Sequence, residues 1–160
     1  MPSSHDASQK PKQDQLIAQF EALCHEQLEL CETLEDIADS LGECPDRQKC
    51  LQMALQLTPI MARAHAFEAE IFFPSLVLIA EQQNEERTRA ANRSLDQLKG
   101  ELEEDIGLVG EVAEALAEFG QGKPSVSPNA MGYLLRGLFV GLRRHLAHEN
   151  QIVRTLTHTH

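Results

Sequence analysis

The chain has 160 residues, a formal net charge of −11 and an aromatic content of only 4%. This length suits one domain with a single core, and abundant Leu, Ala, Glu and Gln beside few aromatic residues favours helices over strands. The negative charge disfavours nucleic acid and anionic membrane surfaces as partners. No apolar run approaches the roughly 20 residues of a membrane span, and the polar N-terminus lacks the apolar segment of a secretory signal. We therefore expect a cytoplasmic protein.

The cysteines form no CxxC pair; they are Cys24, Cys31, Cys44 and Cys50. A helical domain of this size needs no disulfide, so we interpret all of them as reduced thiols. Cys24 and Cys31 are seven residues apart on one apolar stripe, which is typical of small side chains that fill a core.

Residues 1–13 are polar and rich in Ser, Gln and Lys, which predicts a disordered tail before a folded domain at 14–157. The first helix is predicted from about Asp14 to Leu41, with Gly42 as its C-cap. Its apolar residues recur at intervals of three and four; they are Phe20, Cys24, Leu28, Cys31, Leu34, Ala38 and Leu41.

A second periodic stretch extends from Asp46 to about Ala80 and contains Pro59 and Pro74. Proline inside a helix removes a backbone hydrogen bond, so we expect a kink or break near each proline. The predicted inward face comprises Met53, Leu57, Ile60, Met61, Ala64, Ile71, Phe72 and Leu78.

The third and fourth helices complete the predicted fold. The third follows the polar segment EQQNEERTR and ends near Phe119; its apolar stripe is Leu95, Leu98, Leu102, Ile106, Val109, Val112 and Leu116. A loop rich in Gly, Pro and Ser then leads to Ser127, the predicted N-cap of a helix that extends to about Leu156. Four helices with short connections predict an all-α, up-down-up-down four-helix bundle.

Some polar residues fall inside the predicted apolar stripes, where an unpaired charge is costly. At 100° per residue, Glu149 lies almost at the centre of the fourth helix's stripe, and His145 lies within about 40° of it. Glu68 lies within about 20° of the centre of the second helix's stripe, and Asp105 occupies a core position of the third.

The histidines of the first two helices are less well placed. His65 lies about 80° from the stripe centre, but its spacing from Glu68 lets both reach one point if the helix is rotated or kinked. On the first helix Gln27 points inward, whereas His25 lies on the polar side, roughly 150° from the centre.

The candidate site residues share one layer of the bundle, within about 12 Å along its axis; they are His25, His65, Glu68, Asp105, His145 and Glu149. Carboxylates gathered around a histidine repel one another unless protons or a cation intervene, and this mixture of ligands suits iron or manganese. The alternative to a cation is that Arg63, Arg143 or Arg144 supplies the positive charge that offsets the carboxylates.

The segments HAFEAEIFFP and RRHLAHENQIV together resemble the hemerythrin-like (HHE cation-binding) domain, over about Leu16–Leu156. The resemblance depends on His145 and Glu149, and on Glu68 shortly before Phe73 and Pro74. It also matches His25 on the first helix. It implies a non-haem, possibly di-iron, centre held by His and Glu from the four helices, with dioxygen, nitric oxide or iron as the species sensed or handled.

The chain departs from the family pattern at two positions. When it is aligned on Pro74, the histidine of the second helix becomes Ala64, and His65 is displaced by one residue. Between His65 and His145 there is no histidine for the third helix, where Glu103 or Asp105 stands nearest. The predicted site is thus rich in carboxylate, which favours a mixed or mononuclear centre, or loss of metal, over reversible dioxygen carriage.

Two other functions are considered. The first is a metal-free bundle that acts as an interaction or regulatory protein, whose partner the sequence does not identify. The second is a phosphotransfer protein that uses His65, which the acidic and apolar residues after it disfavour. No nucleophile with its base, phosphate loop or Rossmann motif is present, so we expect enzymatic activity only through a metal.

Overall fold

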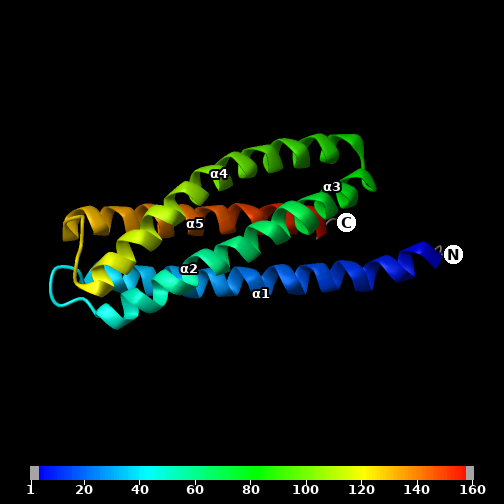
Figure 1. Cartoon of the computed structure of the whole chain (residues 1–160). Helices are drawn as coiled ribbons and strands as arrows, with labels where there is room; N and C mark the ends of the chain where they lie inside the picture. The colour runs from blue at the N-terminus through cyan, green and yellow to red at the C-terminus, as the bar shows by residue number, and fades with distance from the viewer. Residues whose placement is uncertain (1–3, 158–160) are drawn as a thin grey trace.

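The computed structural model describes residues 4–157, and all the predicted helices are found there. The elements in chain order are α1 (Ser4–Ser40), α2 (Arg47–Phe67), the π-helix η1 (Glu68–Phe72), α3 (Phe73–Glu81), α4 (Glu85–Gln121) and α5 (Pro128–Thr157). Because α2, η1 and α3 follow one another without a loop, they form one long helical segment. This segment, α1, α4 and α5 alternate in direction (Figure 1). The predicted four-helix bundle is confirmed.

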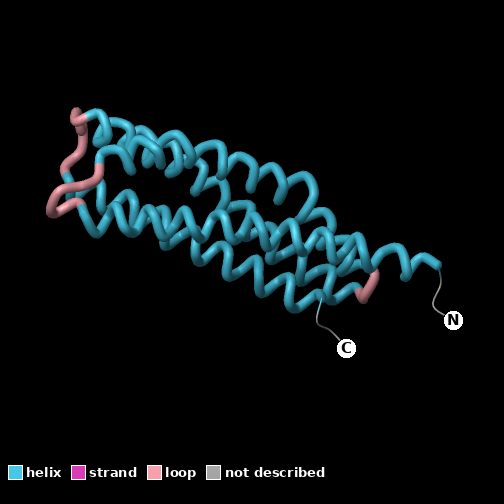
Figure 2. Tube along the Cα trace, turned by 90° about the horizontal axis from the view of Figure 1, so that it is seen from below, coloured by secondary structure: helices cyan, strands magenta, loops and turns pink. Residues whose placement is uncertain are grey.

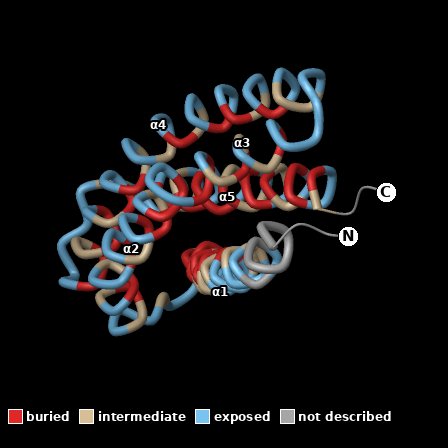
Figure 3. The backbone as a smooth tube through the Cα atoms, turned by 90° about the vertical axis from the view of Figure 1, so that its right-hand side faces the viewer, coloured by how far each residue is buried: buried red, intermediate tan, exposed pale blue. Residues whose placement is uncertain are grey.

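The long helices are arranged as a ring of neighbours. Helix α1 packs against α2 and α5, and α4 packs against the same two helices. Buried residues lie on the sides of the helices that face one another (Figure 3). Two of the loops lie at one end of the bundle and the α3–α4 loop at the other (Figure 2). Within residues 4–157, no helix is both long and apolar enough to cross a membrane.

Helix α1 begins at Ser4, earlier than the expected start near Asp14. Residues 1–3 of the predicted tail lie outside the described range, and the N-terminal end of α1 extends past the other helices of the bundle (Figure 1). Apart from Pro11, which lacks an N–H, each residue added to a nucleated helix gains one hydrogen bond, so a polar segment can extend it without an apolar face.

Side-chain caps define several helix ends. At the start of α2, Asp46 accepts a hydrogen bond from the Lys49 N–H at 3.1 Å. At the start of α5, Ser127 accepts one from the Ala130 N–H at 3.1 Å, as its predicted N-cap role requires. Gly122, with φ 76°, closes α4 in the left-handed conformation. Gly42 does not adopt a positive φ, so the prediction that it caps α1 in this way is wrong.

The two prolines of the second helical segment have different effects. Helix α2 continues through Pro59, where both Pro59 and Leu55 are exposed and water can bind the carbonyl that lacks a partner. Before Pro74 the helix instead widens into η1, in which the Phe73 N–H donates to the Glu68 carbonyl five residues earlier. The expected disturbance is therefore found at Pro74, and it takes the form of a π-helix.

The π-helix changes which residues face the core. Ile71 and Leu78, predicted to point inward, are 44% and 59% exposed, whereas Phe72 is fully buried. The prediction assumed an unbroken period of 3.6 residues, and the wider turn rotates the following helix away from that register. Leu28 and Ile106 were also predicted inward and are 41% and 56% exposed.

Aromatic packing holds η1 against α1. The rings of Phe20 and Phe72 stack with their centroids 4.3 Å apart and an interplanar angle of 8°. Phe72 also lies 5.7 Å from the ring of Phe67 and 6.0 Å from that of Phe73. Such pairs add stability beyond the burial of their area. Because Phe20 lies one turn before Cys24, the stack fixes α1 next to the layer that contains the candidate site.

Replacing Phe72 with Ala is expected to lower the free energy of unfolding by about 3–5 kcal/mol, because it empties a fully buried site. The matched substitution Ile71→Ala is expected to stay within about 0.5 kcal/mol, because its side chain faces solvent. Urea unfolding followed by circular dichroism measures both. A larger loss for Ile71→Ala would mean that the helix keeps its α-helical register through this segment.

Candidate metal centre

Helix α5 carries the first two residues of the candidate centre. His145 and Glu149 are one turn apart on its inner face, and each is only 1% exposed. The His145 Nε2 atom lies 2.5 Å from Glu149 Oε1. The neighbouring residues of this face are buried and apolar; they are Leu138, Leu142, Leu146, Ile152 and Leu156. The predicted inward positions of His145 and Glu149 therefore match the structure.

Glu68, the first residue of η1, joins them from the second helical segment. It is 2% exposed, and its Oε2 atom lies 3.7 Å from His145 Nε2. One ligand atom from each of Glu68, His145 and Glu149 lies within 4.8 Å of the others. A cation with ligands at about 2 Å holds them roughly 3–4 Å apart, so small side-chain movements would let one ion contact all three.

The atoms of this cluster lack other partners. Both nitrogens of His145, both oxygens of Glu149 and Oε2 of Glu68 are buried and make no hydrogen bond within the described part of the chain. Buried polar atoms are normally paired, so each of these needs an explanation. Carboxylate oxygen and imidazole nitrogen are suitable ligands for iron and manganese. The residues present thus fit a cation.

His65 lies on α2 beside the cluster, three residues before Glu68. It is half-buried, and its Nε2 atom is buried without a hydrogen-bond partner among the residues described. Burial lowers the pKa of His65, which favours the neutral imidazole that binds metals. The same burial argues against phosphotransfer, in which this nitrogen would have to be reached by a partner protein.

Asp105 lies on α4 at the edge of the same layer. It is half-buried, and its Oδ2 atom makes no hydrogen bond in the range 4–157. Burial raises the pKa of this carboxyl group. A Cβ atom at Gly141, one turn before His145 on α5, would lie 3.7 Å from Asp105 Oδ1. Asp105 is therefore near the three clustered residues without being one of them.

His25 is not brought to the cluster, which corrects its place among the candidate residues. Its side chain is 75% exposed, and its Nε2 atom pairs with Glu29 Oε1 at 2.9 Å. The cause is its position on the outer face of α1, which presents Cys24 and Gln27 to the core instead.

Burial, followed by the charges of Glu149 and Glu68, raises the pKa of the Cys24 thiol to about 12. All four cysteines are free, in agreement with their interpretation as thiols.

Glu101 on α4 is a site residue that the sequence did not reveal. Its Oε2 atom lies 3.6 Å from Nδ1 of His145. The available signal was its spacing of four residues before Asp105, which puts both carboxylates on one side of α4. Of the three arginines considered as counter-charges, Arg63 pairs with Glu26 at 3.3 Å and Arg143 pairs with Glu35. Arg144 is exposed, and its charge acts on Asp105.

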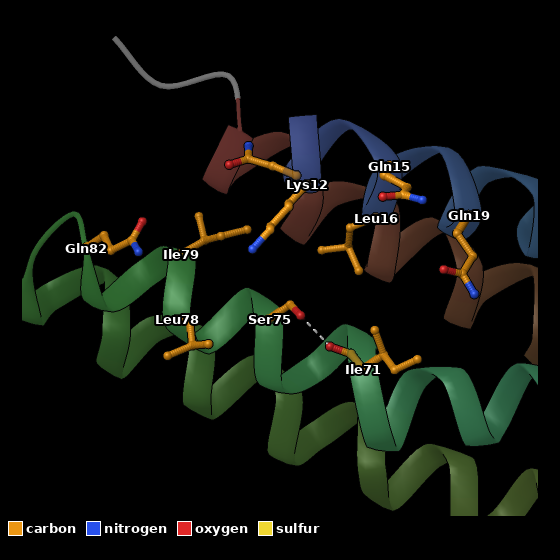
Figure 4. Close-up of a pocket in the computed structure, with 10 residues that line it drawn as sticks. Lys12, Gln15, Leu16, Gln19, Ile71, Ser75, Leu78, Ile79 and Gln82 are labelled. Carbon is orange, nitrogen blue, oxygen red and sulfur yellow. Dashed lines mark hydrogen bonds between the residues drawn. The ribbon is translucent and has the colours of Figure 1, made fainter. Parts of the chain in front are cut away.

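A separate groove lies between the N-terminal half of α1 and α3, with a volume of about 370 Å³. Leu16, Leu78 and Ile79 give it an apolar wall, and Lys12 and several glutamines surround it (Figure 4). The Ser75 hydroxyl on this wall donates to the Ile71 carbonyl at 2.6 Å. None of the candidate ligands lines the groove, so it is distinct from the buried cluster.

A family model described as the hemerythrin HHE cation-binding domain matches residues 16–156, nearly the whole chain. The chain belongs to the hemerythrin HHE family. The resemblance seen in the sequence is therefore confirmed, and membership agrees with a cation-binding function for the Glu68, His145 and Glu149 cluster. Comparison with curated proteins and with solved structures gave no match.

The charges of this HHE domain's cluster are balanced by protons when no cation is bound. Burial alone would lower the pKa of His145, but the adjacent Glu149 and Glu68 carboxylates outweigh it and raise the pKa to about 10. Burial raises the pKa of Glu149 to about 8, although His145 opposes the shift. At neutral pH these shifts favour the retention of protons by the His145–Glu149 pair as a unit. Binding of a cation would release these protons.

The metal-free domain is expected to lose stability as the pH rises. A group whose pKa is higher in the folded state than in the unfolded state stabilises the fold at low pH and loses this effect as the pH rises through the folded-state pKa. For His145 the loss extends from about pH 6.5 to about pH 10, and for Glu149 from about pH 4.5 to about pH 8. The melting temperature in excess chelator should therefore fall from pH 6 to pH 9.5. Glu149→Gln should flatten this dependence and the exposed control Glu29→Gln should not. A melting temperature that rises with pH would contradict the assigned shifts.

Proposed function

We propose that this HHE domain binds non-haem iron through Glu68, His145 and Glu149. The observation that supports the proposal is that each of these three residues has a buried ligand atom that makes no hydrogen bond in the described chain. Iron would supply a redox-active Lewis acid at this position. The protein's own contribution is to hold the carboxylates and imidazole together and to keep bulk water from them, since all three side chains are buried.

His65 and Asp105 are the proposed additional ligands. Each has one buried atom without a partner among residues 4–157, and each borders the cluster from a different helix. With the three clustered residues alone the centre would be mononuclear. Participation of His65 and Asp105 would give it the ligands for a second iron.

The proposed role is to sense or handle dioxygen, nitric oxide or iron. A centre with few imidazoles and three clustered protein ligands leaves coordination positions for a small diatomic molecule. The four free cysteines support a reducing compartment such as the cytoplasm. The net charge of −11 supports partners other than nucleic acid.

Protein from iron-replete cultures is expected to contain iron in near-stoichiometric amounts, measured by mass spectrometry of the metal. The double substitution His145→Ala with Glu149→Ala should abolish this iron. Glu149→Gln, which keeps the side-chain shape, should lower it strongly. His25→Ala is the matched control, because it removes an exposed histidine, and it should leave the iron content unchanged. A folded wild-type protein that contains no iron and takes up none would disprove the proposal.

The second candidate is a metal-free bundle that serves as an interaction or regulatory protein. The observation that favours it is the ion pair of His145 with Glu149, through which the cluster has an internal counter-ion. Ala64, which is buried where the family has a histidine, also favours a metal-free bundle because alanine cannot bind a metal. Thermal unfolding separates the two candidates, because a ligand that binds only the folded state raises the melting temperature. Iron that leaves it unchanged would favour the metal-free bundle.

Interaction with diatomic molecules is testable on the iron-loaded protein. The absorption spectrum of the anaerobic ferrous protein is expected to change when nitric oxide or air is admitted, since the ligand set leaves positions open. The His25→Ala protein should respond in the same way. A spectrum that responds to neither gas, in protein shown to contain iron, would restrict the role to binding or storing iron.

A further inference from the structure

The imidazole of His145 lies between two groups of carboxylates. Its Nε2 atom faces Glu149 and Glu68, at 2.5 Å and 3.7 Å. Its Nδ1 atom, on the opposite side of the ring, faces Oε2 of Glu101 at 3.6 Å. His145 is 1% exposed, and Nδ1 makes no hydrogen bond in the described range. The ring therefore has one nitrogen at the proposed iron position and the other directed at α4.

Glu101 is placed to accept a hydrogen bond from that second nitrogen. Its Oε1 atom accepts one from Gln97 Nε2 at 3.3 Å, one turn earlier on α4, which leaves Oε2 toward His145. The side chain is 31% exposed and so has room to adjust. Closing 3.6 Å to an ordinary N–H···O distance of about 2.9 Å requires a movement of less than about 1 Å.

A histidine that binds a metal through one nitrogen typically donates the N–H of the other to a carboxylate, which fixes the tautomer and the ring orientation. We propose that Glu101 is a positioning residue that accepts the Nδ1–H of His145 and keeps the Nε2 lone pair directed at the space between Glu68 and Glu149. This inference rests on the proposed function, because it assigns the role of a residue outside the ligand set of that centre.

One neighbour of Glu101 on α4 provides a discriminating control. Glu104 carries the same charge on the same helix but is exposed. It would act on the centre only through long-range charge, which salt screens. Asp105 is itself a proposed additional ligand, so it does not serve as a control. Comparing Glu101 with Glu104 separates a local hydrogen bond from a general effect of negative charge.

The experiment uses Zn²⁺ as a diamagnetic probe, with its affinity measured by competition against a chelator. Glu101→Ala is expected to weaken binding by about 10–100-fold, the usual effect of removing such a partner. Glu101→Gln, which retains an acceptor oxygen, should recover part of the loss. Glu104→Ala should weaken binding less than Glu101→Ala does. Equal losses for Glu101→Ala and Glu104→Ala would overturn the assignment.

Proton NMR of the zinc-loaded protein, labelled with ¹⁵N-histidine, provides a readout that a structural role would not change. The Nδ1–H resonance of His145, identified by its loss in His145→Gln, should lie downfield and exchange slowly with water. In Glu101→Ala it should move upfield and exchange faster. Lower affinity with an unchanged resonance would make Glu101 a direct ligand and overturn the proposal. Wild-type protein that binds neither Zn²⁺ nor Fe²⁺ would overturn the proposed function and this inference together, whereas binding unaffected by Glu101→Ala would overturn this inference alone.

Discussion

The bundle has to accommodate two carboxylates and an imidazole in a layer whose neighbours are apolar. Glu68, His145 and Glu149 are each at most 2% exposed, so water cannot supply the counter-charge. An isolated buried charge is strongly destabilising, and two carboxylates side by side are worse. The compensation comes from protons on His145 and Glu149, as their raised pKa values indicate, or from a cation. Protonation, cation binding and folding stability are therefore linked through the same three side chains.

The carboxylate of Glu68 lies where α2 passes into the π-helix η1, and the Glu68 N–H still donates to the Ala64 carbonyl of α2. Pro74 cannot donate to the helical ladder, and η1, the wider turn before it, begins at Glu68. Within η1, Phe72 points inward as the sequence predicted, and its ring stacks on Phe20 of α1. A π-helix is less favourable than an α-helix, and burial of the Phe72 ring offsets that cost. The π-helix η1 thus carries a carboxylate of the candidate centre and also packs against α1.

Periodicity predicted the fold and the central ligands because most of the bundle is regular. Glu149 and His145 lie on α5, an unbroken helix, and 100° per residue placed both of them inside. It misplaced Ile71, because the period changes within η1. Periodicity also put His25 on the outer face of α1, where the structure has it, and only the family resemblance had suggested it as a ligand. Glu101 could not be predicted as a site residue, because its role depends on how α4 is rotated against α5, and the pattern of a single helix does not contain that information.

The charges of the candidate ligand side chains bear on how many cations the centre would hold. Glu68 and Glu149, once ionised, carry the two negative charges that balance one divalent cation, and His145 adds a neutral nitrogen after it loses its proton. His65 would also contribute a neutral nitrogen, because burial lowers its pKa. A second cation would therefore depend on Asp105, whose pKa burial raises. Burial opposes the charged form of Asp105, and a second cation would counteract that effect by binding its carboxylate. A mononuclear centre likewise has to displace the protons of His145 and Glu149, so each metal ion would bind in competition with protons and more tightly as the pH rises.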